Sequence, residues 1–217
     1  MDREKRSVLL LVSIVLLFTL APILEDYATG SLLLILNLYI TLVAATSELA
    51  ENRALFGIAI VLAVTSMILV LTSHYYTAWS LLFANYIVLA VFLMLVSASL
   101  FVYLGKREQV TRDRILVSVS LYFLLGLTWF ALYNVINLVQ PGSFMEAGAP
   151  LTGITHWSTM LYFSLVTLTT LGYGDIVAVK PTARMVATLE ASAGVLYIAI
   201  TVARLVGASS PPHERDR

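Results

Sequence analysis

The chain has 217 residues, of which 59% are hydrophobic and only 12% are charged, whereas a typical soluble domain carries roughly 25% charged residues. This composition excludes an ordinary soluble protein and favours a membrane protein. The net charge is zero and cysteine is absent, so nothing indicates a nucleic-acid partner, a disulfide or a thiolate metal site. The three histidines, His74, His156 and His213, lie far apart in the sequence, which argues against a histidine metal site.

Six apolar runs follow one another along the chain, each close to the roughly 20 residues that a helix needs to cross a bilayer. The runs are Ser7–Leu24, Ser31–Ser47, Ala54–Ser73, Ala78–Leu104, Ile115–Val139 and Ala183–Val206. The first is longer than the apolar part of a signal peptide and no cleavage site follows it, so we expect a retained helix. The sequence therefore predicts an all-α polytopic membrane protein with six transmembrane helices, surrounded by membrane lipid.

Lysine and arginine are concentrated on one side of this predicted bundle. The N-terminus and the links after the second and fourth runs carry Arg3, Lys5, Arg6, Arg53, Lys106, Arg107, Arg112 and Arg114. The opposite side has only Lys180, with Arg184 just beyond it. Because basic loops stay in the cytoplasm, we expect both termini to be cytoplasmic, in a plasma or bacterial inner membrane. The stretch 140–182 then begins and ends on the outer side, which makes it a re-entrant loop.

This re-entrant loop divides into three parts. Gln140–Gly153 is rich in glycine and proline and is interpreted as an exposed extracellular turret. Thr155–Thr169 has the length of a short helix, with Thr155 as its N-cap, and is too short to span. The hexapeptide Thr170–Asp175, TLGYGD, follows it. Irregular backbone at membrane depth has to be buried in protein or line water, so we expect the hexapeptide to line a pathway.

The hexapeptide has the chemistry to bind a dehydrated cation. Backbone carbonyls can replace a hydration shell if they point at one axis, which needs the unusual dihedral angles that Gly172 and Gly174 tolerate. The Thr170 hydroxyl adds an oxygen at the inner end, Tyr173 braces the strand, and Asp175 attracts cations to the outer mouth. The C-terminal end of the preceding helix dipole also faces the cation. Rings of carbonyls are the selectivity device of potassium channels.

The sequence Thr170-Leu171-Gly172-Tyr173-Gly174-Asp175 resembles the signature filter of the tetrameric potassium-channel family. The resemblance covers about Arg114 to Gly207, and it is to a small prokaryotic type of subunit with six helices, one pore loop and no charged voltage-sensor helix. It implies a homotetramer, because one chain supplies one strand of a fourfold ring. It also implies K⁺ as the only bound ion, with no organic cofactor. The implied ion-binding residues are Thr170, Leu171, Gly172 and Tyr173, supported by Thr169, Gly174 and Asp175.

The chain departs from the family pattern at a few positions. Leu171 stands where valine or isoleucine is more common, but it keeps an apolar side chain and the same carbonyl. Tyr162 and Phe163 stand where many members carry a tryptophan pair. Val166 stands where some members carry a glutamate that pairs with the filter aspartate. The two departures in the predicted pore helix bear on how stable the filter is and on whether the channel inactivates.

The last apolar run resembles the inner helix of that family. Gly194 stands at the usual distance for a hinge glycine, and Val195, Ile198, Val202 and Val206 recur on one helical face. This face is interpreted as the lining of an inner cavity, although every other face is apolar too and contact with lipid or protein is an alternative. Glu190 is an acid within the same run, which makes it a functional candidate. It either supports the filter or senses protons, or it is a hydrogen-bonded structural acid behind the pore helix.

These patterns divide the chain into three regions. Residues 1–112 form a peripheral four-helix region, residues 113–207 form the pore module, and residues 208–217 form a short cytoplasmic tail. The predicted function is passive, selective conduction of K⁺, not enzymatic catalysis. The fourth run carries no charge, so we expect no steep voltage gating. The alternatives are a weakly selective cation channel and a non-conducting regulatory or transporter-associated subunit.

Overall fold

The computed structural model of the chain describes residues 3–24, 30–50, 52–76, 78–105, 111–152 and 157–209. The helices within these ranges are α1 (Arg3–Leu24), α2 (Gly30–Ser47), α3 (Arg53–Tyr75), α4 (Trp79–Gly105), α5 (Arg112–Val139), α6 (Trp157–Leu168) and α7 (Pro181–Ser209). Three short strands accompany them, β1 (Phe144–Glu146), β2 (Ala149–Pro150) and β3 (Ile176–Ala178). The predicted N-cap Thr155 lies outside the described residues.

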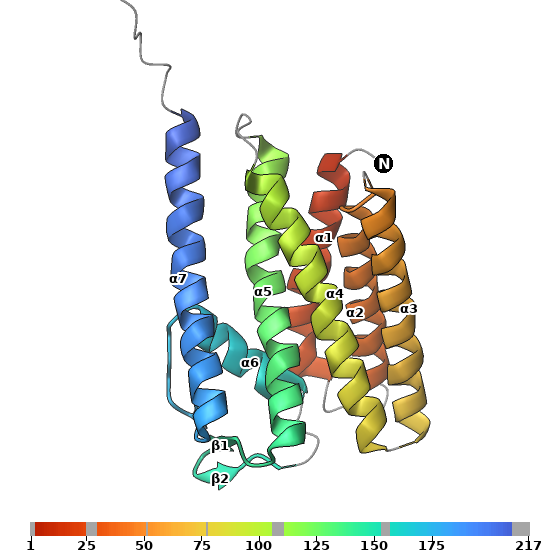
Figure 1. Cartoon of the computed structure of the whole chain (residues 1–217), viewed down its shortest axis with the longest axis vertical. Helices are drawn as coiled ribbons and strands as arrows, with labels where there is room; N and C mark the ends of the chain where they lie inside the picture. The colour runs from red at the N-terminus through yellow and green to blue at the C-terminus, as the bar shows by residue number, and fades with distance from the viewer. Residues whose placement is uncertain are drawn as a thin grey trace, which may run out of the picture.

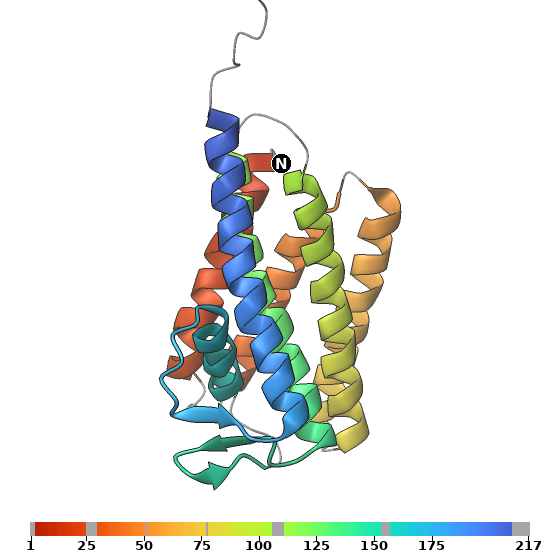
Figure 2. The same ribbon diagram turned by 60° about the vertical axis from the view of Figure 1, so that its left-hand side comes forward.

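The long helices lie side by side, with α5 in the middle. Helices α1 to α4 gather on one side of α5, and α7 stands on the other side (Figure 1). The short α6 lies at about half height against α5 and α7, and the strands close one end (Figure 2). The start of α1 and the end of α7 lie at the opposite end from the strands. This arrangement puts both ends of the described chain on one side, as the distribution of basic residues predicts.

Five helices, α1, α3, α4, α5 and α7, are long and apolar enough to cross a membrane. The prediction of an all-α polytopic membrane protein is confirmed. The second predicted run forms α2, which has 18 residues and packs against α1 and α3. It is shorter than the five spans, as its sequence indicates.

Helix ends follow from local capping residues. The side chain of Asn52 accepts hydrogen bonds from the N–H groups of Ala54 and Leu55, and so begins α3. Thr111 accepts one from the N–H of Arg114 and begins α5. Such side chains satisfy N–H groups that have no partner inside the helix. Helices α4 and α1 pack against α5 of the same chain.

The stretch Gln140–Gly153, the predicted turret, contains a β1–β2 hairpin. The turn at Ala147 and Gly148 has positive φ at both residues, 48° and 82°, which suits the twist of a two-residue hairpin turn. Strand β1 also pairs with β3, which follows the hexapeptide. The turret is thereby joined to the chain that leaves the candidate site.

Candidate ion pathway

Helix α6, the predicted pore helix, is held by aromatic packing and lies close to two glycines. The rings of Tyr133, Phe144 and Phe163 meet edge to face, with centroids 5.0 to 5.4 Å apart. At Gly126 in α5 an added Cβ would lie 2.9 Å from the Leu165 side chain. At Gly194 in α7 it would lie 2.0 Å from the backbone oxygen of Leu168. At Gly194 a side chain would collide with backbone, so only glycine allows α7 to approach α6 this closely, whereas at Gly126 the Leu165 side chain would have to shift.

The predicted hexapeptide follows directly after α6, in irregular backbone. Gly172 and Gly174 have φ of 55° and 80°, the left-handed region that the sequence analysis expects of them. Thr170 also has a positive φ, 59°, which sequence reasoning missed. A residue with a Cβ is strained in this region by roughly 1–2 kcal/mol, and such strain is often found at functional sites. Three residues of the hexapeptide thus depart from strand geometry.

The N–H groups of this segment fold back onto the end of α6. Leu171 donates to the carbonyl oxygen of Val166 at 2.9 Å, and Thr170 donates to that of Thr167 at 2.9 Å. The Thr169 hydroxyl donates to the carbonyl oxygen of Leu165 at 2.7 Å. Within the described residues, no backbone N–H donates to the carbonyls of residues 170–173. These oxygens remain available to a ligand.

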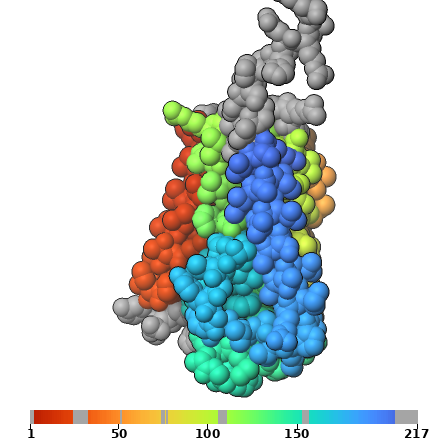
Figure 3. All heavy atoms as spheres, turned by 90° about the vertical axis from the view of Figure 1, so that its left-hand side faces the viewer, coloured from red at the N-terminus to blue at the C-terminus, as the bar shows by residue number. Residues whose placement is uncertain are grey.

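The hexapeptide lies on an open face of the single chain. Leu171 and Tyr173 are 54% and 68% exposed. Figure 3 shows this face, where the region around residues 160–180 and the length of α7 form one surface. Val195, Ile198 and Val202 on α7 are also exposed, at 54%, 50% and 53%. The side chain of Val206, the fourth residue of the predicted lining, lies outside the described residues.

Tyr162 connects α6 to the last residue of the hexapeptide. Its hydroxyl donates to Oδ2 of Asp175 at 2.7 Å, so the pore helix is tied to the last residue of the hexapeptide. This hydrogen bond and the backbone N–H groups of Asp175 and Ile176 hold the pKa of the Asp175 carboxyl below its usual range. The contact could not be found from spacing alone, since Tyr162 and Asp175 are separated by the whole filter segment.

The turret supports the same residue from outside. The N–H of Ala147 donates to the backbone oxygen of Asp175 at 3.3 Å, and Glu146 pairs with Ile176 across β1 and β3. The two ends of the re-entrant loop are therefore hydrogen-bonded to each other at the outer end of the hexapeptide. The sequence carries no clear signal for this pairing, because the strands are only two to three residues long.

Gly194 has a packing reason for being glycine. Its Cα faces the last carbonyl of α6, to which the Tyr122 hydroxyl also donates at 3.3 Å. A hinge motion at Gly194 stays a prediction. Three residues further along α7, the hydroxyl of Tyr197 donates to the backbone oxygen of Ser118 on α5 at 2.6 Å. Helix α7 is thereby fastened to α5 next to the end of the pore helix.

Glu190 is fully buried between α5, α6 and α7. Its carboxyl group contacts the hydroxyls of Tyr133 and Ser164. This environment matches the alternative of a hydrogen-bonded acid behind the pore helix. Sequence reasoning found Glu190 but not its partners, because they come from two other helices.

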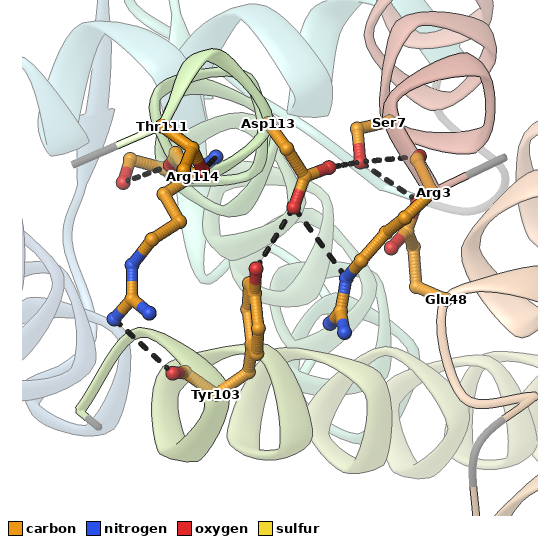
Figure 4. A network of polar contacts seen from close by, with 8 residues as sticks. Arg3, Ser7, Glu48, Tyr103, Thr111, Asp113 and Arg114 are labelled. Carbon is orange, nitrogen blue, oxygen red and sulfur yellow. Dashed lines mark hydrogen bonds and ion pairs between the residues drawn. The ribbon is translucent and has the colours of Figure 1, made fainter. Parts of the chain in front are cut away.

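A second polar cluster joins the outer helices to α5 at the end where the chain starts (Figure 4). Asp113 of α5 accepts hydrogen bonds from Ser7 at 2.5 Å and Tyr103 at 2.8 Å, and its carboxylate lies 3.4 Å from Arg3. The Ser7 hydroxyl also lies 3.1 Å from Oε1 of Glu48, just after α2. Burial raises the pKa of Glu48, a rise partly offset by the Ser7 hydrogen bond. Helices α1, α4 and α5 and the turn after α2 thus share one network.

A family model described as "Ion channel" matches residues 117–208. Over 89 residues the chain is 30% identical to the "Inward rectifier potassium channel Kirbac3.1" of Paramagnetospirillum magnetotacticum, covering 41% of this chain and 26% of that protein. It is 33% identical over 91 residues to the "Shaker-related potassium channel tsha2" of Oncorhynchus mykiss, covering 42% and 19%. Residues 117–208 are therefore similar to ion channels in general and to parts of these potassium channels in particular.

A third potassium-channel relative agrees. The "Potassium voltage-gated channel protein shk-1" of Caenorhabditis elegans is 40% identical over 63 residues, which are 29% of this chain and 12% of that protein. The chain spans about a quarter or less of the length of these relatives. No solved structure matches it significantly. The matched residues include α6, the hexapeptide and α7, but not helices α1 to α4.

Proposed function

We propose that this chain is a potassium-channel subunit, which conducts K⁺ passively through a filter formed by Thr170–Asp175. The observation that carries the proposal is the backbone of this segment. Its glycines have positive φ, the N–H groups of residues 170–172 bond back to α6, and the carbonyls of residues 170–173 have no backbone partner within the described chain. Carbonyl oxygens without internal partners are the ligands that replace the hydration shell of K⁺.

The proposed assignments follow from this geometry. Thr170, Leu171, Gly172 and Tyr173 bind K⁺, the substrate, and Thr169, Gly174 and Asp175 support them. Thr169 does so through its hydroxyl bond to α6, and Asp175 through Tyr162. Residues 113–207 act as the pore module, residues 1–112 as a peripheral region, and residues 208–217 as a cytoplasmic tail.

A single chain supplies one strand of the filter, so the active form is a homotetramer. The exposed filter and the exposed apolar face of α7 support this assembly, since both are open in one chain. In the tetramer Val195, Ile198, Val202 and Val206 line the inner cavity, and an apolar cavity can close by dewetting. The N-terminus and C-terminus face the cytoplasm of a plasma or inner membrane.

The proposed channel lacks steep voltage gating. Moving one charge through the membrane field is worth about 2.3 kcal/mol per 100 mV, so steep gating needs several charges on α4. The α4 sequence, Trp79–Gly105, contains no lysine, arginine, aspartate or glutamate. Current–voltage recordings of the purified protein in planar bilayers test this. An open probability that changes little between −100 and +100 mV agrees, whereas a steep sigmoidal dependence contradicts it.

Purified protein in liposomes tests the conduction itself. With K⁺ on one side and Na⁺ on the other, the proposed function predicts a current that reverses near the K⁺ equilibrium potential. A current that reverses near zero would indicate a weakly selective cation channel. The absence of both current and K⁺ binding would indicate a regulatory or transporter-associated subunit.

A further inference from the structure

Glu190 connects three helices around the pore helix. It lies in the part of α7 that packs against α6 and α5, and its side chain is 0% exposed. The Tyr133 hydroxyl of α5 donates to Oε2, and Ser164 Oγ of α6 lies 2.6 Å from Oε1. Ser164 Oγ also lies 2.8 Å from the backbone oxygen of Gly126 on α5. A continuous line of polar atoms therefore runs from α5 through α7 and α6 back to α5.

The number of protons available for these hydrogen bonds decides whether the carboxyl group of Glu190 is protonated. A serine hydroxyl has one proton to donate, and a backbone carbonyl can only accept. The contact between Ser164 and Gly126 uses the serine proton. The contact between Ser164 Oγ and Glu190 Oε1 is then a hydrogen bond only if the carboxyl group of Glu190 donates. An ionised Glu190 would instead accept the hydrogen bond of the Ser164 hydroxyl, and the backbone oxygen of Gly126 would then lose its donor.

Among the described residues, no cationic side chain lies along α5, α6 or α7 close to Glu190. Helix α6 contains no charged residue, and the nearest basic residues along α7 are Arg184 and Arg204. The charged residues of α5 are confined to its first turn, about five turns before Tyr133. Those of α1 lie in its first turn, at the far end of the bundle.

The remaining titratable groups nearby are hydroxyls or are engaged elsewhere. Tyr122 of α5 lies close enough to Glu190 to interact with its charge, and its hydroxyl donates to the backbone oxygen of Leu168 at 3.3 Å. Asp175, beyond α6, accepts from Tyr162. Burying an ionised carboxylate without a cation is strongly unfavourable. A neutral carboxyl group satisfies every polar contact named above.

We propose that Glu190 is a protonated positioning residue, which donates to Ser164, accepts from Tyr133 and fastens the pore helix to the outer and inner helices. The inference rests on the proposed function, since the positioned segment is the K⁺ filter. Ser164 stands in α6 six residues before Thr170, so a displacement of α6 at Ser164 displaces the filter. Any movement of α7 near Glu190 breaks the same hydrogen bonds, which couples the inner helix to the filter.

Two substitutions separate this role from mere space filling. Glutamine has the shape of a protonated glutamate, with one donor and one acceptor group. Glu190→Gln should therefore keep the K⁺/Na⁺ permeability ratio of the wild type. Glu190→Leu has a similar volume but no hydrogen bonds, and it should lower that ratio about tenfold, the size expected from losing one or two buried hydrogen bonds. A Leu variant that matches wild type while the Gln variant fails would overturn the proposal.

Infrared spectroscopy tests the proton without relying on conduction. The difference spectrum of wild type minus Glu190→Gln at neutral pH should contain the C=O stretch of a protonated carboxyl group. The two bands of an ionised carboxylate in its place would overturn the proposal, whatever the channel conducts. If the wild type shows the protonated band but no K⁺ selectivity, the proposed function fails and the protonated state of Glu190 stands. The spectrum also decides the case if Glu190→Leu does not assemble.

Discussion

The hydroxyl of Tyr162 donates to Oδ2 of Asp175 at 2.7 Å, and this bond ties the pore helix to the outer end of the filter segment. Many members of the family carry tryptophan at the position of Tyr162. A phenol and an indole differ in size, but each presents one donor at the end of a rigid ring. The hydroxyl of Tyr162 therefore supplies Asp175 with a hydrogen-bond donor from α6.

Tyr162→Phe removes only this donor, and we expect it to destabilise the outer end of the filter. Channels should close spontaneously during sustained recording several-fold faster than wild type, because a hydrogen bond to an ionised group is among the stronger kind. Single-channel recording in symmetric K⁺ measures the open times. Tyr162→Trp is the matched control, since its indole N–H can also donate, and it should restore long openings. Equal open times in Tyr162→Phe and wild type would contradict the account.

Gly174→Ala tests whether the filter backbone needs its positive φ. The φ of Gly174 is 80°, and a residue with a Cβ loses about 1–2 kcal/mol there. We expect the variant to assemble but to lose K⁺ conduction and K⁺ binding. Gly148→Ala in the turret is the control, because its φ of 82° is nearly the same and an added Cβ meets nothing within 4 Å. Its backbone strain is similar, yet conduction should persist.

Binding of K⁺, measured by calorimetry, and flux into liposomes distinguish these two glycine variants. Loss of conduction in both would mean that strain anywhere in the re-entrant loop is sufficient. Retention of conduction in both would mean that the carbonyls of residues 170–173 do not form the pathway.

Gly194→Ala should destabilise the fold. An added Cβ would lie 2.0 Å from the backbone oxygen of Leu168, so α7 and α6 would have to move apart. Overpacking of this kind costs roughly 1–3 kcal/mol. Thermal unfolding in detergent should show a lower melting temperature. Gly57→Ala in α3 is the control, since a Cβ added at this position meets nothing within 4 Å, and alanine favours a helix. A melting temperature for Gly194→Ala as high as that of Gly57→Ala would be inconsistent with the close contact.

The burial of Glu48 predicts that the free energy of unfolding depends on pH. Burial raises the pKa of its carboxyl group in the folded protein above the usual value of 4.5. The folded chain then binds a proton more tightly than the unfolded chain, so its stability is greatest below pH 4.5 and falls as pH rises through the raised pKa. Thermal melts across this window should show the decline, and Glu48→Gln should flatten it. Glu146→Gln, on the exposed turret, should leave the slope unchanged.

The helices could be predicted from the sequence because the signal is simple. Long apolar runs with few or no charges favour a membrane span, and the five long helices follow such runs within a few residues. The hexapeptide can also be predicted from the sequence, since glycines at alternate positions after a short apolar helix are typical of a segment that lines an ion pathway. The family match over residues 117–208 agrees with this part of the interpretation.

The missing features all depend on contacts between distant residues. Strand β1 of the turret pairs with β3, which lies beyond α6 in the sequence, and two or three residues are too few for an alternating pattern. The partners of Glu190 lie on α5 and α6, and no spacing relates them. Gly194 was identified by its distance from the filter, but its contact with Leu168 appears only when α6 and α7 are packed. Thr170 adopts a positive φ that its residue type does not favour.

The most direct test of the account is the reversal potential of the purified protein in liposomes, with K⁺ on one side and Na⁺ on the other. The account predicts a current that reverses close to the K⁺ equilibrium potential, because four copies of Thr170–Asp175 form a carbonyl-lined filter. A current of the same size that reverses near zero would contradict it.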